Sequence, residues 1–188
     1  MKTLKFALIL LAATIFFNTA AFAEYLPSEA TQAERVNSLD LVASFLQSDN
    51  YVASRLEFRK LSADPVRDLV SITTANGIQA NVRARAIQSL ALYGHDVRVR
   101  EVLENLITKN RATHALYPTI ILAYAEAFGE QGVATLEGLA SHRNTDVRMA
   151  TVVALGRFGG QAGFDLLSVL AQTEGDHAVH QRITSYVR

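Results

Sequence analysis

The segment VRARAIQSLALYG, residues 82–94, and the segment VRMATVVALGRFG, residues 147–159, are two copies of one sequence pattern. The second copy begins 65 residues after the first, and a weaker third copy between them ends at Phe128 and Gly129. The true period is therefore close to half of that offset. A repeat of this length, filled with helical patterning, predicts a stack of helical hairpins.

Each copy places its small and apolar side chains on one face of a helix. The spacing is i, i+3, i+4, i+7, i+8 and i+11, which gathers these residues on one side at roughly 100° per residue. In the second copy they are Val147, Ala150, Thr151, Ala154, Leu155 and Phe158. The same places in the first copy hold Val82, Arg85, Ala86, Ser89, Leu90 and Tyr93, with Arg85 and Ser89 as departures from the pattern. Packing such faces between hairpins predicts a continuous core that no single hairpin could form.

Capping and turn signals predict an all-α fold. Asp64 and Pro65 indicate a helix start, because aspartate accepts from unpaired N–H groups and proline loses no bond in the first turn. Gly94 predicts a helix end with a left-handed glycine, and Asp146 is expected to cap the helix that follows it. The expected helices cover residues 30–47, 51–61, 66–75, 81–93, 97–109, 113–128, 133–141, 147–158, 163–172 and 177–186, about five hairpins.

The N-terminal residues have the pattern of a secretory signal peptide. Lys2 and Lys5 precede the apolar run of residues 6–17, and small residues follow, with Ala21 and Ala23 at the positions that signal peptidase requires. The apolar run is short for a membrane span, although an uncleaved anchor is the alternative. We expect a signal peptide of residues 1–23 and one domain of residues 24–188, located in the periplasm or secreted.

Composition excludes several classes of function. The chain has no cysteine, so it has no disulfide, thiolate metal ligand, cysteine nucleophile or lipidated N-terminal cysteine. The 18 basic and 18 acidic residues balance, and removal of Lys2 and Lys5 leaves a net charge of −2. Such a charge gives no bulk attraction to nucleic acid or anionic lipid. We expect no nucleic-acid partner and no membrane insertion of the mature chain.

The sequence DVR at residues 146–148, with Ala150, ALG at 154–156 and FG at 158–159, resembles the second helix of HEAT repeats. It has the form common in bacterial HEAT-like repeat proteins. A second good copy starts with NVR at residues 81–83 and runs to Gly94, with asparagine in place of the usual aspartate. The resemblance is specific over residues 65–159, weaker in the first hairpin and partial at the C-terminus.

The resemblance implies a right-handed, armadillo-like α-α superhelix, or α-solenoid. It further implies a ladder between successive repeats, formed by the acidic or amide residue and the arginine at the start of each second helix. Those structural roles fall on Asp146 with Arg148 and on Asn81 with Arg83. Pro118 stands in the arginine position of the middle copy and interrupts the ladder there.

No group of residues forms a catalytic constellation, and we expect no cofactor and no metal site. His177 and His180 share one helical face, but a closed site needs more ligands than this pair supplies. Four cations, Arg83, Arg85, Arg98 and Arg100, lie near one repeat boundary and could hold an anion. Acidic residues close by favour mutual neutralisation instead.

The second helices also carry small and apolar residues opposite the core face. In HEAT-like stacks second helices line the concave surface, so these positions would form a shallow groove for a peptide or a partner's helix. The alternative is that neighbouring hairpins or a terminal helix cover them. The expected partner-binding residues are Ala84, Ile87, Ala91, Met149, Val152 and Gly156.

The sequence therefore favours an exported, non-enzymatic HEAT-like protein that binds a protein or peptide partner through its concave face and acts as a scaffold. The alternative is a small-molecule-handling enzyme subunit, since some HEAT-like proteins resemble phycobilin lyase subunits. Neither hypothesis fixes the partner or the oligomeric state.

Overall fold

The computed structural model describes residues 29–109 and 115–188, and in these ranges the regular secondary structure is entirely helical. The chain divides into two compact units, Met1–Arg35 and Val36–Arg188. Of the first unit, the described part is residues 29–35, the beginning of helix α2 (Glu29–Gln47). The expected signal peptide lies outside the described residues. Among the described helices, none combines the length and the apolar character needed to cross a membrane.

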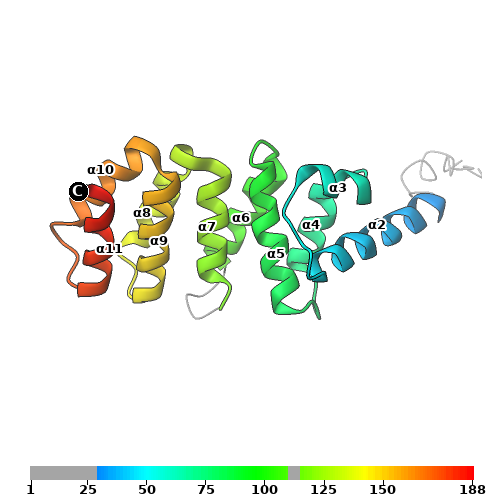
Figure 1. Cartoon of the computed structure of the whole chain (residues 1–188), viewed down its shortest axis with the longest axis horizontal. Helices are drawn as coiled ribbons and strands as arrows, with labels where there is room; N and C mark the ends of the chain where they lie inside the picture. Colours follow the sequence, from blue (N-terminus) through cyan, green and yellow to red (C-terminus); the bar gives the residue numbers. More distant parts are fainter. Residues whose placement is uncertain (1–28, 110–114) are drawn as a thin grey trace, which may run out of the picture. The chain divides into compact units, whose positions relative to one another are not determined.

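The second unit contains the remainder of α2 and a series of short helices (Figure 1). They are α3 (Arg55–Leu61), α4 (Pro65–Thr74), α5 (Ala80–Leu90), α6 (Val97–Lys109), α7 (Tyr117–Phe128), α8 (Val133–Ala140), α9 (Thr145–Phe158), α10 (Gly160–Leu170) and α11 (His177–Val187). Short 3₁₀ turns extend α5 over Ala91–Tyr93 and join α7 to α8 over Gly129–Gly132. The predicted helices are confirmed, with ends shifted by a few residues.

Helices that follow one another in the chain pack as pairs: α4 with α5, α6 with α7, α8 with α9 and α10 with α11. The second members of these pairs also contact one another in chain order, α5 with α7, α7 with α9, and α9 with α11. Figure 1 shows these four helices standing side by side within the second unit. Each internal second helix therefore packs against its own partner and against the second helix on either side.

The predicted core face is buried in both copies. Val82, Ala86 and Leu90 are at most 1% exposed, as are Val147 and Leu155. Burial of each valine and leucine side chain of this set stabilises the folded state by about 1.5–3 kcal/mol. These residues belong to one cluster that runs from Val42 to Ile183.

In the first copy, the two polar residues on that face, Arg85 and Ser89, make bonds that replace those they would make with water. Ser89 Oγ donates to the Arg85 carbonyl at 2.6 Å and lies 2.6 Å from the Tyr51 hydroxyl. Arg85 Nη1 donates to the carbonyls of Leu46 and Ser48, at 2.7 and 2.9 Å. Buried polar groups are costly unless they are paired. These bonds satisfy both side chains, and those of Arg85 also cap the C-terminal end of α2.

The structure confirms the predicted start of α4 and corrects that of α9. Asp64 is the N-cap of α4, where its carboxylate accepts from the Arg67 backbone N–H and Pro65 is the first helical residue. At α9 the N-cap is Asn144, not Asp146, and its side chain accepts from the Asp146 backbone N–H at 2.8 Å. The helix thus begins two residues earlier than expected, because asparagine is an equally good cap.

Gly94 ends its helix for a different reason from the predicted one. Its φ is −58°, in the right-handed region, so no left-handed conformation requires glycine there. A Cβ at this position would instead collide with the backbone carbonyl of Ala127 on α7. The glycine therefore permits close approach of two successive second helices. The third copy differs, because Gly129 does have a positive φ of 53°.

Candidate functional site

The face predicted to bind a partner is partly covered within the chain. Ala84, Ala91 and Met149 are half-buried and keep accessible surface. Ile87 and Val152 are each 1% exposed and belong to the core cluster. Those two side chains cannot touch a partner in this conformation, so the expectation of exposure is wrong for them.

Ile87 and Val152 are buried because a second helix has neighbours on several sides. Helix α9 contacts α7, α8, α10 and α11, so the buried arc is wider than the single stripe that the sequence pattern describes. Gly156 is covered in a related way, by the terminal helix. A Cβ on Gly156 would come within 2.5 Å of the Tyr186 ring of α11, which packs directly over the glycine.

Met149 forms part of a hollow between α9 and α11, which we call the α9–α11 groove. The hollow has a volume of about 420 Å³. One wall is Met149, and the other is a stripe on α11 with spacing i, i+3, i+4 and i+7. The lining residues are Met149, Ala178, Gln181, Arg182 and Ser185. Toward the C-terminal ends of the two helices, contact of Tyr186 with Gly156 closes the space between them.

The sequence analysis did not predict the groove residues of α11, although their spacing along the helix indicates them. Residues 178, 181, 182 and 185 are small or polar, in register with the buried pair Val179 and Ile183 on the other side of the helix. The C-terminal copy matches the repeat pattern poorly, so only the two strong copies were read for a binding face. The same helical spacing applied to residues 177–186 would have found this stripe.

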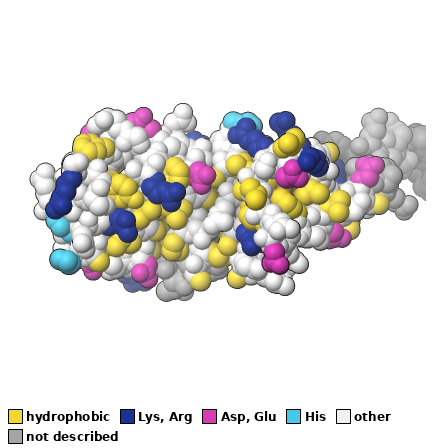
Figure 2. Space-filling model, viewed as in Figure 1, with side chains coloured by type: hydrophobic (Ala, Val, Ile, Leu, Met, Phe, Trp, Pro, Cys, Tyr) yellow, Lys and Arg dark blue, Asp and Glu magenta, His cyan; other side chains and the backbone are white. Residues whose placement is uncertain are grey.

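The groove carries positive charge without a matching acidic residue on α11. Helix α11 contains Arg182 and no aspartate or glutamate, and Arg157 lies exposed near the end of α9. Within the described part of the chain, neither arginine takes part in an ion pair. Figure 2 shows dark-blue and yellow side chains over α9 and α11, with magenta side chains at the upper and lower edges of this end of the molecule.

The arginine of the expected ladder in the second strong copy, Arg148, has a different acidic partner from the predicted one. Arg148 does reach the next hairpin, but its acidic partner is Glu174 in the connection before α11: Nε donates to Oε2 at 2.9 Å and Nη2 to Oε1 at 3.1 Å. A third bond runs from Arg148 Nη1 to the His142 carbonyl at 2.8 Å. Burial alone would raise the pKa of Glu174, but the bonds from Arg148 and from the Asp176 backbone N–H outweigh burial and lower it.

In the first strong copy, Arg83 stays within its own hairpin. Its Nη2 donates to the Ala75 carbonyl at the end of α4, at 2.6 Å. No hydrogen bond found among the described residues involves the side chain of Asn81 or of Asp146. The ladder of Asn81 with Arg83 and Asp146 with Arg148 is therefore not formed as expected, and Arg148 alone of these four residues joins two successive hairpins.

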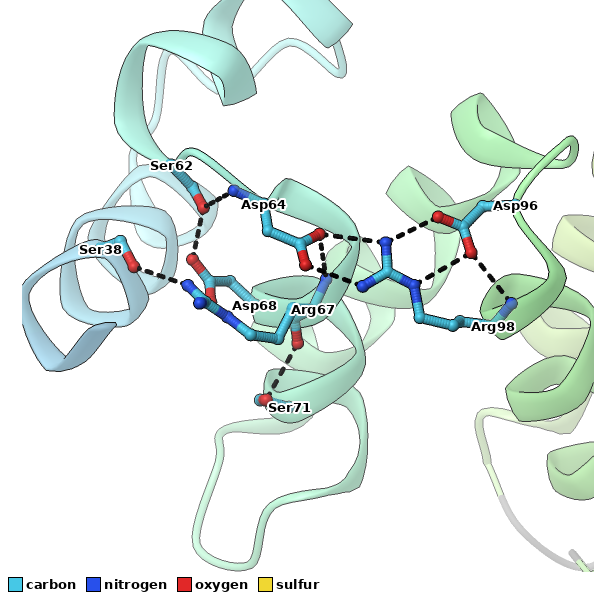
Figure 3. A network of polar contacts seen from close by, with 8 residues as sticks. All are labelled: Ser38, Ser62, Asp64, Arg67, Asp68, Ser71, Asp96 and Arg98. Carbon is cyan, nitrogen blue, oxygen red and sulfur yellow. Dashed lines mark hydrogen bonds and ion pairs between the residues drawn. The ribbon is translucent and has the colours of Figure 1, made fainter. Parts of the chain in front are cut away.

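An ion pair between successive hairpins is formed instead by two first helices, α4 and α6. Arg98, at the start of α6, donates to both carboxylate oxygens of Asp64, the cap of α4, at 2.8 and 3.1 Å (Figure 3). It also donates to Asp96 Oδ2 at 2.7 Å, while Asp96 Oδ1 caps α6 through the Arg98 backbone N–H. The guanidinium holds the pKa values of both carboxyl groups below their usual range.

A buried carboxylate lies next to this ion pair. Asp68 is 2% exposed and accepts from Ser62 Oγ at 2.6 Å and from Arg67 Nε at 2.8 Å, and Arg67 also reaches Ser38 (Figure 3). A hollow of about 390 Å³ between α4 and α6 adjoins the network. Because Arg67 and Arg98 already hold acidic partners, we treat this region as structural.

The four arginines considered as an anion site do not converge. Arg83, Arg85 and Arg98 have the separate partners described above. Arg100 Nη1 lies 3.4 Å from Glu104 Oε1, and its guanidinium stacks at 4.0 Å from the centre of the Phe128 ring. Each cation therefore serves a different contact between helices.

The histidines do not gather with other ligands in the described ranges. No group of three or more His, Asp or Glu side chains there has the arrangement to hold a metal ion. His142 has a local role, since its Nδ1 accepts from the Asn144 backbone N–H at 3.0 Å at the start of α9.

No model of a known protein family matches this chain, and no curated protein matches it.

Proposed function

We propose that this chain is an exported, non-enzymatic scaffold with a HEAT-like fold, a right-handed α-solenoid, and that its second helices bind a protein or peptide partner. The observation that carries the proposal is the α9–α11 groove, in which the half-buried Met149 faces a polar stripe on α11. A hollow with an apolar wall and a few polar groups is the usual form of a peptide-binding surface.

The packing of the helices supports the proposed solenoid. Each second helix contacts the next one along the chain, from α5 through α7 and α9 to α11. In repeat proteins such nearest-neighbour contacts give an extended surface on which equivalent positions of successive repeats come together. Ala84 on α5 and Met149 on α9 are equivalent positions in the two strong copies, so both belong to the proposed binding face.

The test is recovery of partners from an envelope extract of the host by immobilised wild-type protein and by variants. The binding-face variant is Ala84→Glu with Met149→Glu; both residues are half-buried, whereas a charge at the buried Ile87 would cost stability. The matched control is Ala134→Glu with Val169→Glu, exposed positions on the first helices α8 and α10. We expect the binding-face variant to lose partners that the control retains. Equal recovery by all three proteins would refute the proposal.

The proposed export has a separate test. Removal of the expected signal peptide, residues 1–23, leaves Glu24 as the first residue. Intact mass measurement of the protein purified from the host envelope or medium should give the mass of residues 24–188. Recovery of the uncleaved chain from the cytoplasm would contradict export and would leave the binding test unaffected.

A further inference from the structure

From the charge and shape of the α9–α11 groove, we propose that its occupant is an acidic segment of a partner protein that also carries a large apolar side chain. This inference rests on the proposed binding function and adds the chemistry of the partner. It follows from three features of the groove: an unpaired cation, an apolar wall, and a side-chain amide.

The cation is Arg182. It is exposed, lines the groove, and takes part in no ion pair within residues 29–109 and 115–188. By contrast, Arg98 and Arg148 hold carboxylates of this chain. A guanidinium presents a planar set of donors that matches a carboxylate in a two-bond arrangement. Arg182 is therefore available for an acidic group that the chain itself does not provide.

The electrostatic surroundings favour the same partner. Helix α11 has no acidic residue, and the exposed Arg157 adds a second cation near the end of α9. The acidic residues of these elements lie at their N-terminal ends: Asp146 in the first turn of α9, and Asp176, which caps α11 through the backbone N–H groups of Ala178 and Val179. Beyond those ends Arg182 has no carboxylate of its own helix beside it, and such a cation favours encounter with an acidic partner over a basic one.

The remaining lining fits a polypeptide rather than an isolated anion. Met149 is an unbranched, adaptable side chain that accommodates apolar groups of different shapes. Gln181 offers both a donor and an acceptor, the pair of functions that a peptide backbone also presents. Ser185, one turn further along the helix, donates its hydroxyl to the Arg182 carbonyl at 2.6 Å, so its oxygen can serve a partner only as an acceptor. A phosphate or a lipid headgroup would use the arginine but would leave the apolar wall and the amide acceptor unmatched.

The experiment selects binders from a displayed library of random peptides on the immobilised protein, followed by measurement of affinity with synthetic copies. We expect the enriched peptides to be net acidic and to contain a large apolar residue beside the carboxylates. Their affinity for Arg182→Glu should fall about tenfold or more, as for loss and reversal of a charge-assisted contact. Their affinity for Met149→Ser should fall about tenfold as well, because the apolar contact is removed.

The control is Arg59→Glu, the same change of charge at an exposed arginine of α3, outside the groove. It should bind the selected peptides as the wild type does. Circular dichroism and thermal unfolding should give the wild-type result for each variant, since Arg182 and Arg59 are exposed and Met149 is half-buried. An increase in salt should weaken wild-type binding and have less effect on Arg182→Glu.

Three results would overturn the inference. One is enrichment of peptides without an acidic bias, or of none at all; another is equal binding by wild type and Arg182→Glu. The third is Arg182-dependent binding to vesicles of anionic phosphatidylglycerol with no binding of acidic peptides, which would assign the groove to lipid. If partners from the extract are still lost with Ala84→Glu and Met149→Glu, the proposed function survives each of these results and only the acidic partner is refuted.

Discussion

At the scale of single residues, two glycines in helical conformation have opposite effects on stability. Gly94 lies where a Cβ would collide with the Ala127 carbonyl, whereas a Cβ on Gly138, inside α8, would meet nothing within 4 Å. Glycine inside a helix costs conformational entropy unless its small size is needed. Gly94 is needed for the approach of two second helices, and Gly138 is not.

We predict that Gly94→Ala lowers the free energy of unfolding by about 1–3 kcal/mol, because the neighbouring backbone must move to admit the methyl group. Gly138→Ala is the matched control and should raise it by about 0.5–1 kcal/mol, through helix propensity alone. Urea denaturation of both variants checks the pair. A stabilising effect of Gly94→Ala would contradict the close approach.

The ion pairs of Arg98 give a prediction about pH. Asp64 and Asp96 have lowered pKa values in the folded protein, so the stability they contribute is present above the unfolded value of about 3.9 and is lost as the pH falls through the folded values. Arg98→Met should therefore be less stable than wild type at neutral pH, by at most about 1 kcal/mol for so exposed a pair.

That difference should begin to shrink as the pH falls below the unfolded value of about 3.9, and it should vanish below the lowered folded pKa values, where both carboxyl groups are protonated in wild type and variant alike. Thermal unfolding from pH 7 to pH 3 measures it. The control is Arg59→Met, which removes a cation that has no ion pair in the part of the chain that the structure describes. A difference that persists unchanged at pH 3 would show that Arg98 acts through packing.

At the scale of elements, Arg148 and Glu174 join α9 to the connection that leads into α11. The side chains are 16% and 8% exposed, so each would remain as a nearly buried charge if its partner were removed. Glu174 also accepts from the Asp176 backbone N–H, and Asp176 caps α11. The pair therefore connects the start of one second helix with the start of the next.

We predict that Glu174→Gln lowers the free energy of unfolding by about 3 kcal/mol, because Arg148 is left without its charge partner. Amide hydrogen exchange should increase first in α11, while α5 keeps its protection. As a control, Lys60→Met breaks an exposed pair with Glu57, whose side chains are 60% and 43% exposed, and should cost at most about 0.5 kcal/mol. Uniform loss of protection over the whole chain would argue against a local link.

The sequence predicted the helices well because their signals are local. Asp64 with Pro65 gave the start of α4, and that helix ends at Thr74, one residue before the expected end. The first residues of α3 were not predictable in this way. Tyr51 was expected to begin that helix, but it lies before it, with its hydroxyl bonded to Ser89 from a distant helix.

The candidate site was predicted less completely, because exposure depends on contacts between elements. Met149 was predicted from its position on the helix, opposite the core face, and it does line the α9–α11 groove. Ile87 and Val152 also lie opposite the core face of their helices, but neighbouring helices bury them. The residue pattern of one helix gives no information about such neighbours. The choice of Glu174 rather than an aspartate as partner of Arg148 likewise depends on how one hairpin is placed against the next.

At the scale of the whole molecule, the proposed solenoid makes a prediction about truncation. If stability is a sum of hairpins and their interfaces, a chain that ends at Phe158, without α10 and α11, should keep the helices before that point. It should unfold at lower urea concentration and with a smaller m-value, since less surface is exposed on unfolding. Circular dichroism and urea titration check both. Loss of all helical signal on truncation would contradict a fold in which each hairpin is stabilised only by its neighbours.

The start of α10 is completed by a residue from much earlier in the chain. Gly159 provides no side-chain cap, and the Ala162 backbone N–H instead donates to Glu130 Oε1 at 2.9 Å, beside Gly160 with its φ of 57°. Glu130 precedes α10 in the chain, so its carboxylate is present in any N-terminal fragment that contains that helix. Arg148, in contrast, has its acidic partner later in the chain, at Glu174. A fragment that stops after α10 but before Glu174 would therefore contain the complete start of α10, while α9 would still lack its anchor.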